Sequence, residues 1–389
     1  SVSFIIADYN WFGHDATNYT IKPTFDGVTI NNWLFLNGTA NPNNITFTQT
    51  SDVIFKLYAY NSNKVSEYNN NLLNKVDLTM TATNGEVNVA EAKLGEPVRF
   101  YPDDVGIGEV TATIENVACT VPLTIVRGTT FKDLNKTING NNDDVIVLDR
   151  DFTYDPTTDN KFKDGIVINR PITIIGNNHA LNALNQARIF NIRADNVTIE
   201  SIKFENAKST GDGGAVNWDG ANGGLYGCDF VNNSAEGSSG DGGAVYWYGA
   251  NGSLSDCDFV NNSAGSDGGA VYWDADYGNL YGCDFVNNSA KGTSSEGGAI
   301  YWDGANGGLY GCDFVDNNAE DGGAVFWYRS YGSLYDCDFV NNSASSDGGA
   351  VYWDGSYGSL YDCDFVDNDA EDGGAVYWDG SYGSLYDCD

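Results

Sequence analysis

From Gly213 to its end, the chain repeats one pattern of apolar and polar residues seven times. Each copy reads GGAVxW (once GGAIxW), then six residues, then LxxCDFVxNxA, although the last copy stops inside this phrase. Each Gly pair precedes its cysteine by 15 residues, whereas the segment before the next pair varies in length. A period of 25 to 29 residues indicates a solenoid, a propeller or another repeat array. The cysteines lie at Cys228, Cys257, Cys283, Cys312, Cys337, Cys363 and Cys388.

The residues between the glycines favour strands. Gly pairs, Asn pairs and Asp-Gly steps interrupt every short apolar run, and Val, Ile, Tyr, Trp and Phe fill those runs. A propeller blade needs about 40–45 residues, so the shorter period predicts a coil of two or three short strands. Coils of this kind stack in parallel at about 4.8 Å. We therefore predict a parallel β-helix.

Within one coil, Leu225, Cys228 and Phe230 are expected to point inward, because Cys228 and Phe230 are two residues apart on one strand. An asparagine at one turn is expected to form a hydrogen-bonded ladder along the stack, as stacked amides do in cross-β structures. Its copies are Asn233, Asn262, Asn288, Asn317, Asn342 and Asn368.

Two further positions of the coil are less determined. Gly223 and its copies are expected to supply a positive φ at another bend. Alternation leaves open whether Trp218 and its copies point inward, or the neighbouring column of Asn217 and Tyr246 does.

Residues 1–127 lack the repeat and contain β-rich runs separated by Asn, Gly, Pro and Asp. About seven short strands at this spacing predict an antiparallel, immunoglobulin-like β-sandwich. The runs are Val2–Ala7, Val28–Leu36, Val53–Tyr60, Val76–Ala82, Val98–Tyr101, Glu109–Ile114 and Val121–Val126.

Residues 128–208 are predicted to form a cap and the first, irregular coils. Thr130–Ile138 is a helix candidate with a capping box between Thr130 and Asp133, expected to cover the apolar end of the stack. Residues 209–389 are the regular coils, and we expect a longer protein because Cys388 is followed by Asp389 alone. Strands are expected at Val145–Leu148, Gly165–Asn169, Ile172–Ile175, Arg188–Ile192 and Val197–Phe204.

The charge of the chain constrains its partners. The net charge is −35, and residues 209–389 hold thirty acidic residues but two basic ones, Lys291 and Arg329. Such a surface repels nucleic acid and anionic membranes. The sequence has no apolar stretch of the ~18 residues that span a membrane. Sequons for N-glycosylation favour an extracellular location, although a chain rich in Asn, Ser and Thr also produces such sequons by chance. They begin at Asn18, Asn37, Asn44, Asn135, Asn196 and Asn251, with others in the repeats at Asn232, Asn261, Asn287 and Asn341.

The repeats also carry a family resemblance. GGAV or GGAI, paired with FVNN or FVDN at Phe230–Asn233 and its copies, resembles the GGA[ILV] and FxxN repeats of polymorphic outer-membrane proteins. The layout is more similar to adhesin-like surface proteins of methanogenic archaea, which share an Ig-like segment, a helix like Phe131–Ile138 and CDFVxN-type repeats. This resemblance implies a right-handed β-helix and a role in attachment to cells or surfaces.

Two columns invite a chemical interpretation. The cysteines, one per coil, lack the spacing of a zinc site, and we favour free thiols over disulfides between neighbouring coils; alkylation followed by intact-mass measurement tests this. Carboxylates that follow the cysteines are expected to stack outward, where structural calcium is one way to offset their repulsion. A melting temperature unchanged by EGTA would count against calcium. These carboxylates include Asp229, Asp258, Asp284, Asp313, Asp338 and Asp364.

Aromatic columns are the candidate ligand-binding residues. A stripe of tyrosines beside Asp and Asn can bind sugars by ring stacking and hydrogen bonds, or pack against another protein. The alternative is that these ladders only stabilise the stacked strands. One column contains Tyr226, Tyr281, Tyr310, Tyr335, Tyr361 and Tyr386, with Ser255 as the exception, and the other contains Tyr246, Tyr272, Tyr301, Phe326, Tyr352 and Tyr377.

We therefore expect an extracellular, non-enzymatic cell-surface adhesin or stalk, without a cofactor apart from the calcium considered above. Its expected partner is the surface of a host or neighbouring cell, including its glycans. A self-assembling surface fibre or sheath is the alternative, joined through an uncapped end or a donated strand such as Ser1–Ala7. A polysaccharide lyase or glycosidase is less favoured, because the acids recur with the repeat and His14 and His179 lie outside it.

Overall fold

A computed structural model describes residues 5–6, 10–15, 28–29, 32–61, 64–68, 76–114, 117–140 and 142–389. The chain divides into two compact units, Ser1–Gly128 and Thr129–Asp389.

The strands of the first unit form two main sheets. Their bounds are β1 Ile5–Ile6, β2 Asn10–Asp15, β3 Val28–Thr29, β4 Asn32–Asn41, β5 Asn44–Thr46, β6 Ser51–Asn61, β7 Lys64–Glu67, β8 Asp77–Thr83, β9 Gly85–Val87, β10 Glu91–Lys93, β11 Pro97–Pro102, β12 Gly106–Ile114 and β13 Val117–Val126. Among the described residues, one sheet has the order β10-β8-β12-β13-β5 and the other β2-β4-β6-β11-β9, with β7 beside β6. Alternate residues of both sheets, such as Val53, Phe100 and Val110, are buried in one shared core.

This unit is a sandwich of two sheets, but it is not wholly antiparallel as predicted. Strand β5 pairs in parallel with β13, and β2 pairs in parallel with β4. The short strands β9 and β10 went unpredicted because three residues give too little alternation to detect. The predicted strand Val2–Ala7 lies outside the described residues except for β1.

The second unit begins with the predicted cap. Helix α1, Phe131–Asn139, starts at Thr130 with the predicted capping box to Asp133. Its residues Phe131, Leu134 and Ile138 are buried in the same core as the coils, which confirms the helix and its covering role. Sequence analysis did not predict the role of Asp159. Its fully buried carboxylate accepts hydrogen bonds from the backbone N–H groups of Phe131 at 2.8 Å and Lys132 at 2.9 Å.

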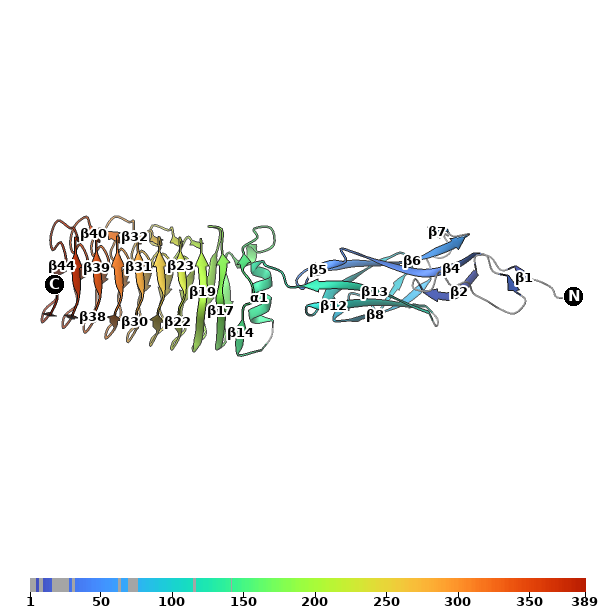
Figure 1. The fold of residues 1–389 in the computed structure, drawn as a ribbon, viewed down its shortest axis with the longest axis horizontal. Coiled ribbons are helices and arrows are strands. Elements are labelled where there is room, and N and C mark those ends of the chain that lie inside the picture. The colour runs from blue at the N-terminus through green and yellow to red at the C-terminus, as the bar shows by residue number, and fades with distance from the viewer. Residues whose placement is uncertain are drawn as a thin grey trace. The chain divides into compact units, whose positions relative to one another are not determined.

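The coils after α1 form three parallel sheets (Figure 1). The long sheet contains β14 Val145–Val147, β15 Phe152–Thr153, β17 Ile172–Asn182, β19 Val197–Glu205, β22 Gly224–Tyr226, β23 Asp229–Val231, β26 Ser253–Ser255, β27 Asp258–Val260, β30 Asn279–Tyr281, β31 Asp284–Val286, β34 Gly308–Tyr310, β35 Asp313–Val315, β38 Ser333–Tyr335, β39 Asp338–Val340, β42 Ser359–Tyr361, β43 Asp364–Val366 and β45 Ser384–Tyr386.

The other two sheets are shorter. The tryptophan sheet contains β16 Asp164–Ile168, β18 Arg188–Ile192, β21 Val216–Trp218, β25 Val245–Trp247, β29 Val271–Trp273, β33 Ile300–Trp302, β37 Val325–Trp327, β41 Val351–Trp353 and β44 Val376–Trp378. The third sheet contains β20 Lys208–Ser209, β24 Ser234–Ala235, β28 Ser263–Ala264, β32 Ser289–Ala290, β36 Asn318–Ala319 and β40 Ser343–Ala344. A short 3-10 helix lies at Asn160–Phe162.

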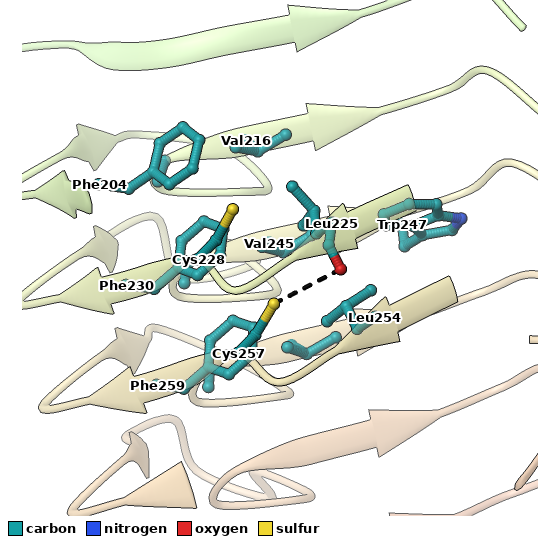
Figure 2. Close-up of a cluster of buried hydrophobic side chains, with 14 of the residues drawn as sticks. Phe204, Val216, Leu225, Cys228, Phe230, Val245, Trp247, Leu254, Cys257 and Phe259 are labelled. Atoms are coloured by element: carbon teal, nitrogen blue, oxygen red, sulfur yellow. Dashed lines mark hydrogen bonds between the residues drawn. The ribbon is translucent and has the colours of Figure 1, made fainter. Parts of the chain in front are cut away.

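Each turn lies on the next in register, so equivalent residues form columns. Strands β22 and β26 align Leu225 with Leu254, and β23 and β27 align Phe230 with Phe259. Figure 2 shows Cys228 and Cys257 in one such column beside the two phenylalanines. Leu225, Cys228 and Phe230 are fully buried, as predicted. The chain therefore contains the predicted parallel β-helix.

Trp218 and its copies are the inward column of the tryptophan sheet. The rings of Trp218 and Trp247 stack with centroids 4.2 Å apart and planes 12° from parallel, and the same contact continues along the sheet. Trp218 is fully buried. The neighbouring Tyr246 position therefore faces outward.

The structure corrects the role predicted for Gly223 and its copies. The positive φ belongs to the preceding residue, 55° at Asn222 and 59° at Tyr277. Glycine is needed at the next position because the indole lies against it: a Cβ on Gly223 would meet the Trp218 ring at 2.4 Å. The seven glycines are Gly223, Gly252, Gly278, Gly307, Gly332, Gly358 and Gly383.

The predicted asparagine ladder is confirmed. The side-chain amide of Asn233 donates to the side-chain oxygen of Asn262 at 3.0 Å and to the carbonyl of Phe204 at 3.0 Å. That same Asn262 oxygen also accepts the backbone N–H of Asn233 at 3.0 Å. Asn233 and Asn262 are buried, so these bonds satisfy amide groups that water cannot reach.

Candidate functional site

The outer face of the long sheet carries the first predicted tyrosine column. Tyr281, Tyr310 and Tyr335 occupy one position in successive turns, with ring centroids 5.0 and 5.7 Å apart. The stack continues through Tyr361 to Tyr386 at 4.5 and 4.7 Å. The exposed fraction is 43% for Tyr281 and 38% for Tyr335, so the column is accessible along its length.

The stacking of the rings limits which surfaces of this tyrosine column a ligand can contact. The ring planes of neighbouring tyrosines lie within 14° of parallel, so each inner ring has a ring against both faces. A sugar cannot stack on a covered face, and only ring edges and hydroxyl groups remain for a ligand that lies along the column. The predicted stacking of sugars therefore does not apply to the inner rings Tyr310, Tyr335 and Tyr361.

The second predicted column, on the outer face of the tryptophan sheet, is much less accessible. Tyr301 is 8% exposed and Phe326 5% exposed, while Tyr246, Tyr272 and Tyr352 are half-buried. Tyr246 donates its hydroxyl to Asp274 at 3.3 Å. Burial, followed by the charge of nearby carboxylates, raises the pKa of Tyr246. These rings mainly pack against each other, which is the structural alternative that the sequence left open.

A column of acids that the sequence analysis missed borders these rings. It lies immediately before each Gly pair. Four of its carboxylates accept the backbone N–H of the acid in the next turn; Asp241 accepts from Asp267 at 3.1 Å and Asp267 from Glu296 at 2.9 Å, and Asp212 and Asp321 make the same contact. Burial raises the pKa of Asp241 to about 6 and that of Glu296 to about 7. The signal was present in the repeat: the column comprises Asp212, Asp241, Asp267, Glu296, Asp321, Asp347 and Asp372.

Because the pKa values of these carboxylates are raised, we predict that the β-helix loses stability as the pH rises from 5 to 8. The folded pKa of Glu296 lies above its ordinary 4.5, so between these values the folded chain binds more protons than the unfolded chain. The contribution of protonated Glu296 to the free energy of unfolding is complete below the pKa of the unfolded chain. It disappears as the pH rises through the pKa of the folded chain. Melting temperatures across this range should fall, and Glu296→Gln should flatten the curve, whereas the exposed Asp367→Asn should not. A profile that Glu296→Gln leaves unchanged would contradict this assignment.

The acids that follow the cysteines form the expected outward column. Asp258 pairs with Asp284, and Asp284 with Asp313, in successive turns. Burial, then the charge of neighbouring carboxylates, raises the pKa of all three. At the first turn, Asp229 instead has a cation, Lys203, at 3.3 Å.

The calcium interpretation of this column stays a prediction. In the part of the chain that the structure describes, no three His, Cys, Asp or Glu side chains converge to hold a metal ion. The aligned positions Asp229, Asp258, Asp284, Asp313, Asp338 and Asp364 instead lie along a flat strand surface, one per turn.

The cysteine column lies in the core. Cys228 and Cys257 are fully buried, and the Cys257 thiol lies 3.5 Å from the Leu225 carbonyl, the contact drawn in Figure 2. Hydrogen bonding to the thiols of Cys228 and Cys283, and then burial, raise the pKa of the Cys257 thiol. A buried thiol of this kind behaves as a small apolar side chain.

The sequon asparagines lie in different surroundings. Asn44, Asn196 and Asn251 are exposed, whereas Asn37 and Asn135 are half-buried. The remaining predicted site, Asn18, lies outside the described residues. Glycosylation at these positions stays a prediction.

A third tyrosine column was also missed. Tyr331, Tyr357 and Tyr382 stack 5.0 and 4.9 Å apart, and Tyr382 is 75% exposed. Their φ angles of 59° to 64° are unusual for a bulky residue, and Asn222 fills the same position in the first copy. The alternation of Asn and Tyr at this turn was the available sequence signal.

Comparison with known proteins agrees with the coiled architecture. A family model described as a right-handed beta helix region matches residues 243–389. The fold is therefore a right-handed β-helix preceded by a β-sandwich. No curated protein matches the chain. Among the described helices, none is long and apolar enough to cross a bilayer.

Proposed function

We propose that this chain is part of an extracellular attachment protein that binds the surface of a host or neighbouring cell without catalysis. The β-helix acts as a rod whose outer face offers the same chemical groups in every turn. The observation that carries the proposal is the column of Tyr281, Tyr310, Tyr335 and Tyr361, in which hydroxyl-bearing ring edges recur at 4.5 to 5.7 Å. A polymer lying along the rod meets many equivalent weak contacts, which together give avidity.

Surface glycans are the ligand class that suits this face. Glycan hydroxyl groups can donate to the carboxylates of Asp284, Asp313 and Asp338 and exchange hydrogen bonds with the tyrosine hydroxyls. The acidic surface disfavours nucleic acid and anionic polymers. The resemblance of the repeats to archaeal adhesin-like proteins supports the proposal, as does the two-sheet sandwich that precedes the β-helix.

A lyase or glycosidase remains the alternative that the β-helix fold itself raises. Catalysis of glycoside cleavage needs one distinct pair of carboxylates. The carboxylates of this rod recur with the turn, as the alignment of Asp258, Asp284 and Asp313 shows. Release of reducing ends from a polysaccharide by the purified chain would overturn the non-enzymatic assignment.

The proposal predicts that removing three hydroxyl groups weakens attachment. The triple variant Tyr310→Phe, Tyr335→Phe and Tyr361→Phe keeps the ring stack but removes the polar edges, so binding to cells or immobilised glycans should fall at least about tenfold, the effect of losing roughly 1.4 kcal/mol. The matched control is Tyr272→Phe, Tyr301→Phe and Tyr352→Phe in the covered column, which already contains Phe326. Equal loss in both variants, or none in the first, would refute the proposal.

A further inference from the structure

The tyrosine column of the long sheet has one break. In the second copy of the repeat its position holds Ser255, and the register places Ser255 directly between Tyr226 and Tyr281. Turns of the coil are about 4.8 Å apart, so these two tyrosines stand about 9.6 Å apart with no ring between them. The break forms a slot one ring wide on an otherwise continuous stack.

Tyr226 and Tyr281 border the slot. On the side of Ser255, no neighbouring ring covers the face of either tyrosine. Among the described residues, the stacked pairs of this column run from Tyr281 to Tyr386. Tyr226 and Tyr281 are 40% and 43% exposed, close to the 38% of the inner ring Tyr335, so it is the missing ring and not the overall exposure that distinguishes them. The slot therefore provides what the continuous column lacks, two aromatic faces open to a ligand.

The floor of the slot is polar and accessible. Ser255 is half-buried and its hydroxyl lies 2.9 Å from a carboxylate oxygen of Asp256. Asp256 is exposed, and the corresponding residues of the turns on either side are Gly227 and Gly282, which have no side chain to shield it. A ligand between the two rings thus meets an unshielded carboxylate at one edge.

We propose that this slot binds one neutral pyranose ring, held between Tyr226 and Tyr281 with its hydroxyl groups on Asp256 and Ser255. A centred ring lies about 4.8 Å from each tyrosine, which suits the puckered, hydrogen-bearing faces of a saturated sugar. A flat aromatic ligand in carbon contact at about 3.5–4.0 Å with one tyrosine leaves a gap to the other. The acidic surface excludes anionic sugars. The inference rests on the attachment function proposed above, because that function identifies the source of the sugar as a glycan of the partner surface.

The first test fills the slot. Saturation-transfer NMR of the full chain with methyl β-glucopyranoside, methyl β-galactopyranoside and methyl α-mannopyranoside should detect binding of at least one, with a dissociation constant on the order of 1 mM. Ser255→Tyr completes the stack, so it should raise the melting temperature and weaken this binding at least about tenfold. Absence of binding to all three sugars, or equal binding by Ser255→Tyr, would overturn the proposal.

The second test moves the slot. Tyr335 is followed by Asp336 and Cys337, just as Ser255 is followed by Asp256 and Cys257, and it lies between Tyr310 and Tyr361. The flanking residues are Gly311 and Asp362 where the native slot has Gly227 and Gly282, so Asp362→Gly completes the match. Adding Tyr335→Ser and Asp362→Gly to Ser255→Tyr should therefore restore sugar binding at the new position. Failure to restore it in a folded triple variant would show that the slot geometry does not determine binding.

Attachment of the rod to cells is measured separately from these solution experiments. Pyranoside binding that Ser255→Tyr abolishes, in a chain that does not attach to cells, supports the slot and refutes the attachment function. Attachment by a chain whose pyranoside binding is unaffected by Ser255→Tyr refutes the slot and leaves the attachment function standing.

Discussion

Gly298→Ala should cost the β-helix about 3–5 kcal/mol of unfolding free energy, through overpacking and displaced backbone hydrogen bonds. Gly298 is the second glycine of its pair, and a Cβ there would lie 2.0 Å from the Gly323 carbonyl oxygen and 2.6 Å from backbone atoms of Asn318. All these atoms are backbone atoms, so no side-chain rotation can relieve the clash. The melting temperature should fall by roughly 6–12 °C or more.

The matched control is a glycine whose surroundings are open. Gly311 has a φ of 58°, and a Cβ there would come no closer than 4.0 Å, to the Asp336 carbonyl. Asparagine tolerates this backbone conformation, and Asp336 and Asp362 occupy the same position in later turns. Gly311→Asn should therefore change the melting temperature little. Similar losses in Gly298→Ala and Gly311→Asn would mean that the close approach of the turns at Gly298 is not real.

Asn317→Ala should destabilise the rod by about 2–4 kcal/mol, because it leaves buried groups without partners. The side chain of Asn317 donates to the Phe285 carbonyl at 2.9 Å and to the Asn342 side-chain oxygen at 3.0 Å. Its own oxygen accepts the backbone and side-chain N–H groups of Asn288 at 2.9 and 3.0 Å. Chemical denaturation of the two proteins measures the difference.

Asp316 provides the control for the ladder. It is exposed and precedes Asn317, and asparagine already stands at its position in other copies, for example Asn287. Asp316→Asn should leave the denaturation midpoint close to that of the wild type, within the roughly 0.5 kcal/mol usual for surface changes. If the asparagine ladder does not contribute to stability, Asn317→Ala and Asp316→Asn will have the same denaturation midpoint.

The architecture of the β-helix was predictable because seven copies of the repeat show the same spacing of apolar and polar residues. Leu225, Cys228 and Phe230 are each inward in the structure, and the Asn233 ladder follows from one asparagine at one turn. Helix α1 was predictable from local chemistry alone, since a capping box and an apolar face lie within nine residues.

The direction of the tryptophans could not be derived from alternation, since in the later copies the residue before the tryptophan, such as Tyr246 before Trp247, is also a large aromatic residue. The missing fact was three-dimensional: the Trp218 indole lies on Gly223, five residues later, and leaves no room for a Cβ. The same contact explains why the prediction of a positive φ at Gly223 was wrong. A glycine five residues after the tryptophan of every repeat was the sequence signal for this packing.

The candidate site was predictable as a set of residues but not in its chemistry. Sequence columns identified Tyr281 and Tyr301 equally, whereas burial separates them into an exposed edge and a covered ring. Ser255 was visible as an exception in the repeat, but its meaning depends on register, which places it between two ring faces. The repeat pattern had already placed Ser255 in the tyrosine column, but it does not report which ring faces their neighbours cover, because that depends on side-chain packing.

The β-helix and the columns on its surface exist only if each turn lies on the next in register. Oxidative cross-linking tests this directly, with the pair Asp258→Cys and Asp284→Cys in adjacent turns and the pair Asp258→Cys and Asp313→Cys two turns apart. Adjacent positions, about 4.8 Å apart, lie within disulfide reach and those at about 9.6 Å do not. The account predicts rapid cross-linking of the first pair alone. Equal cross-linking of both pairs, or preference for the second, would contradict it.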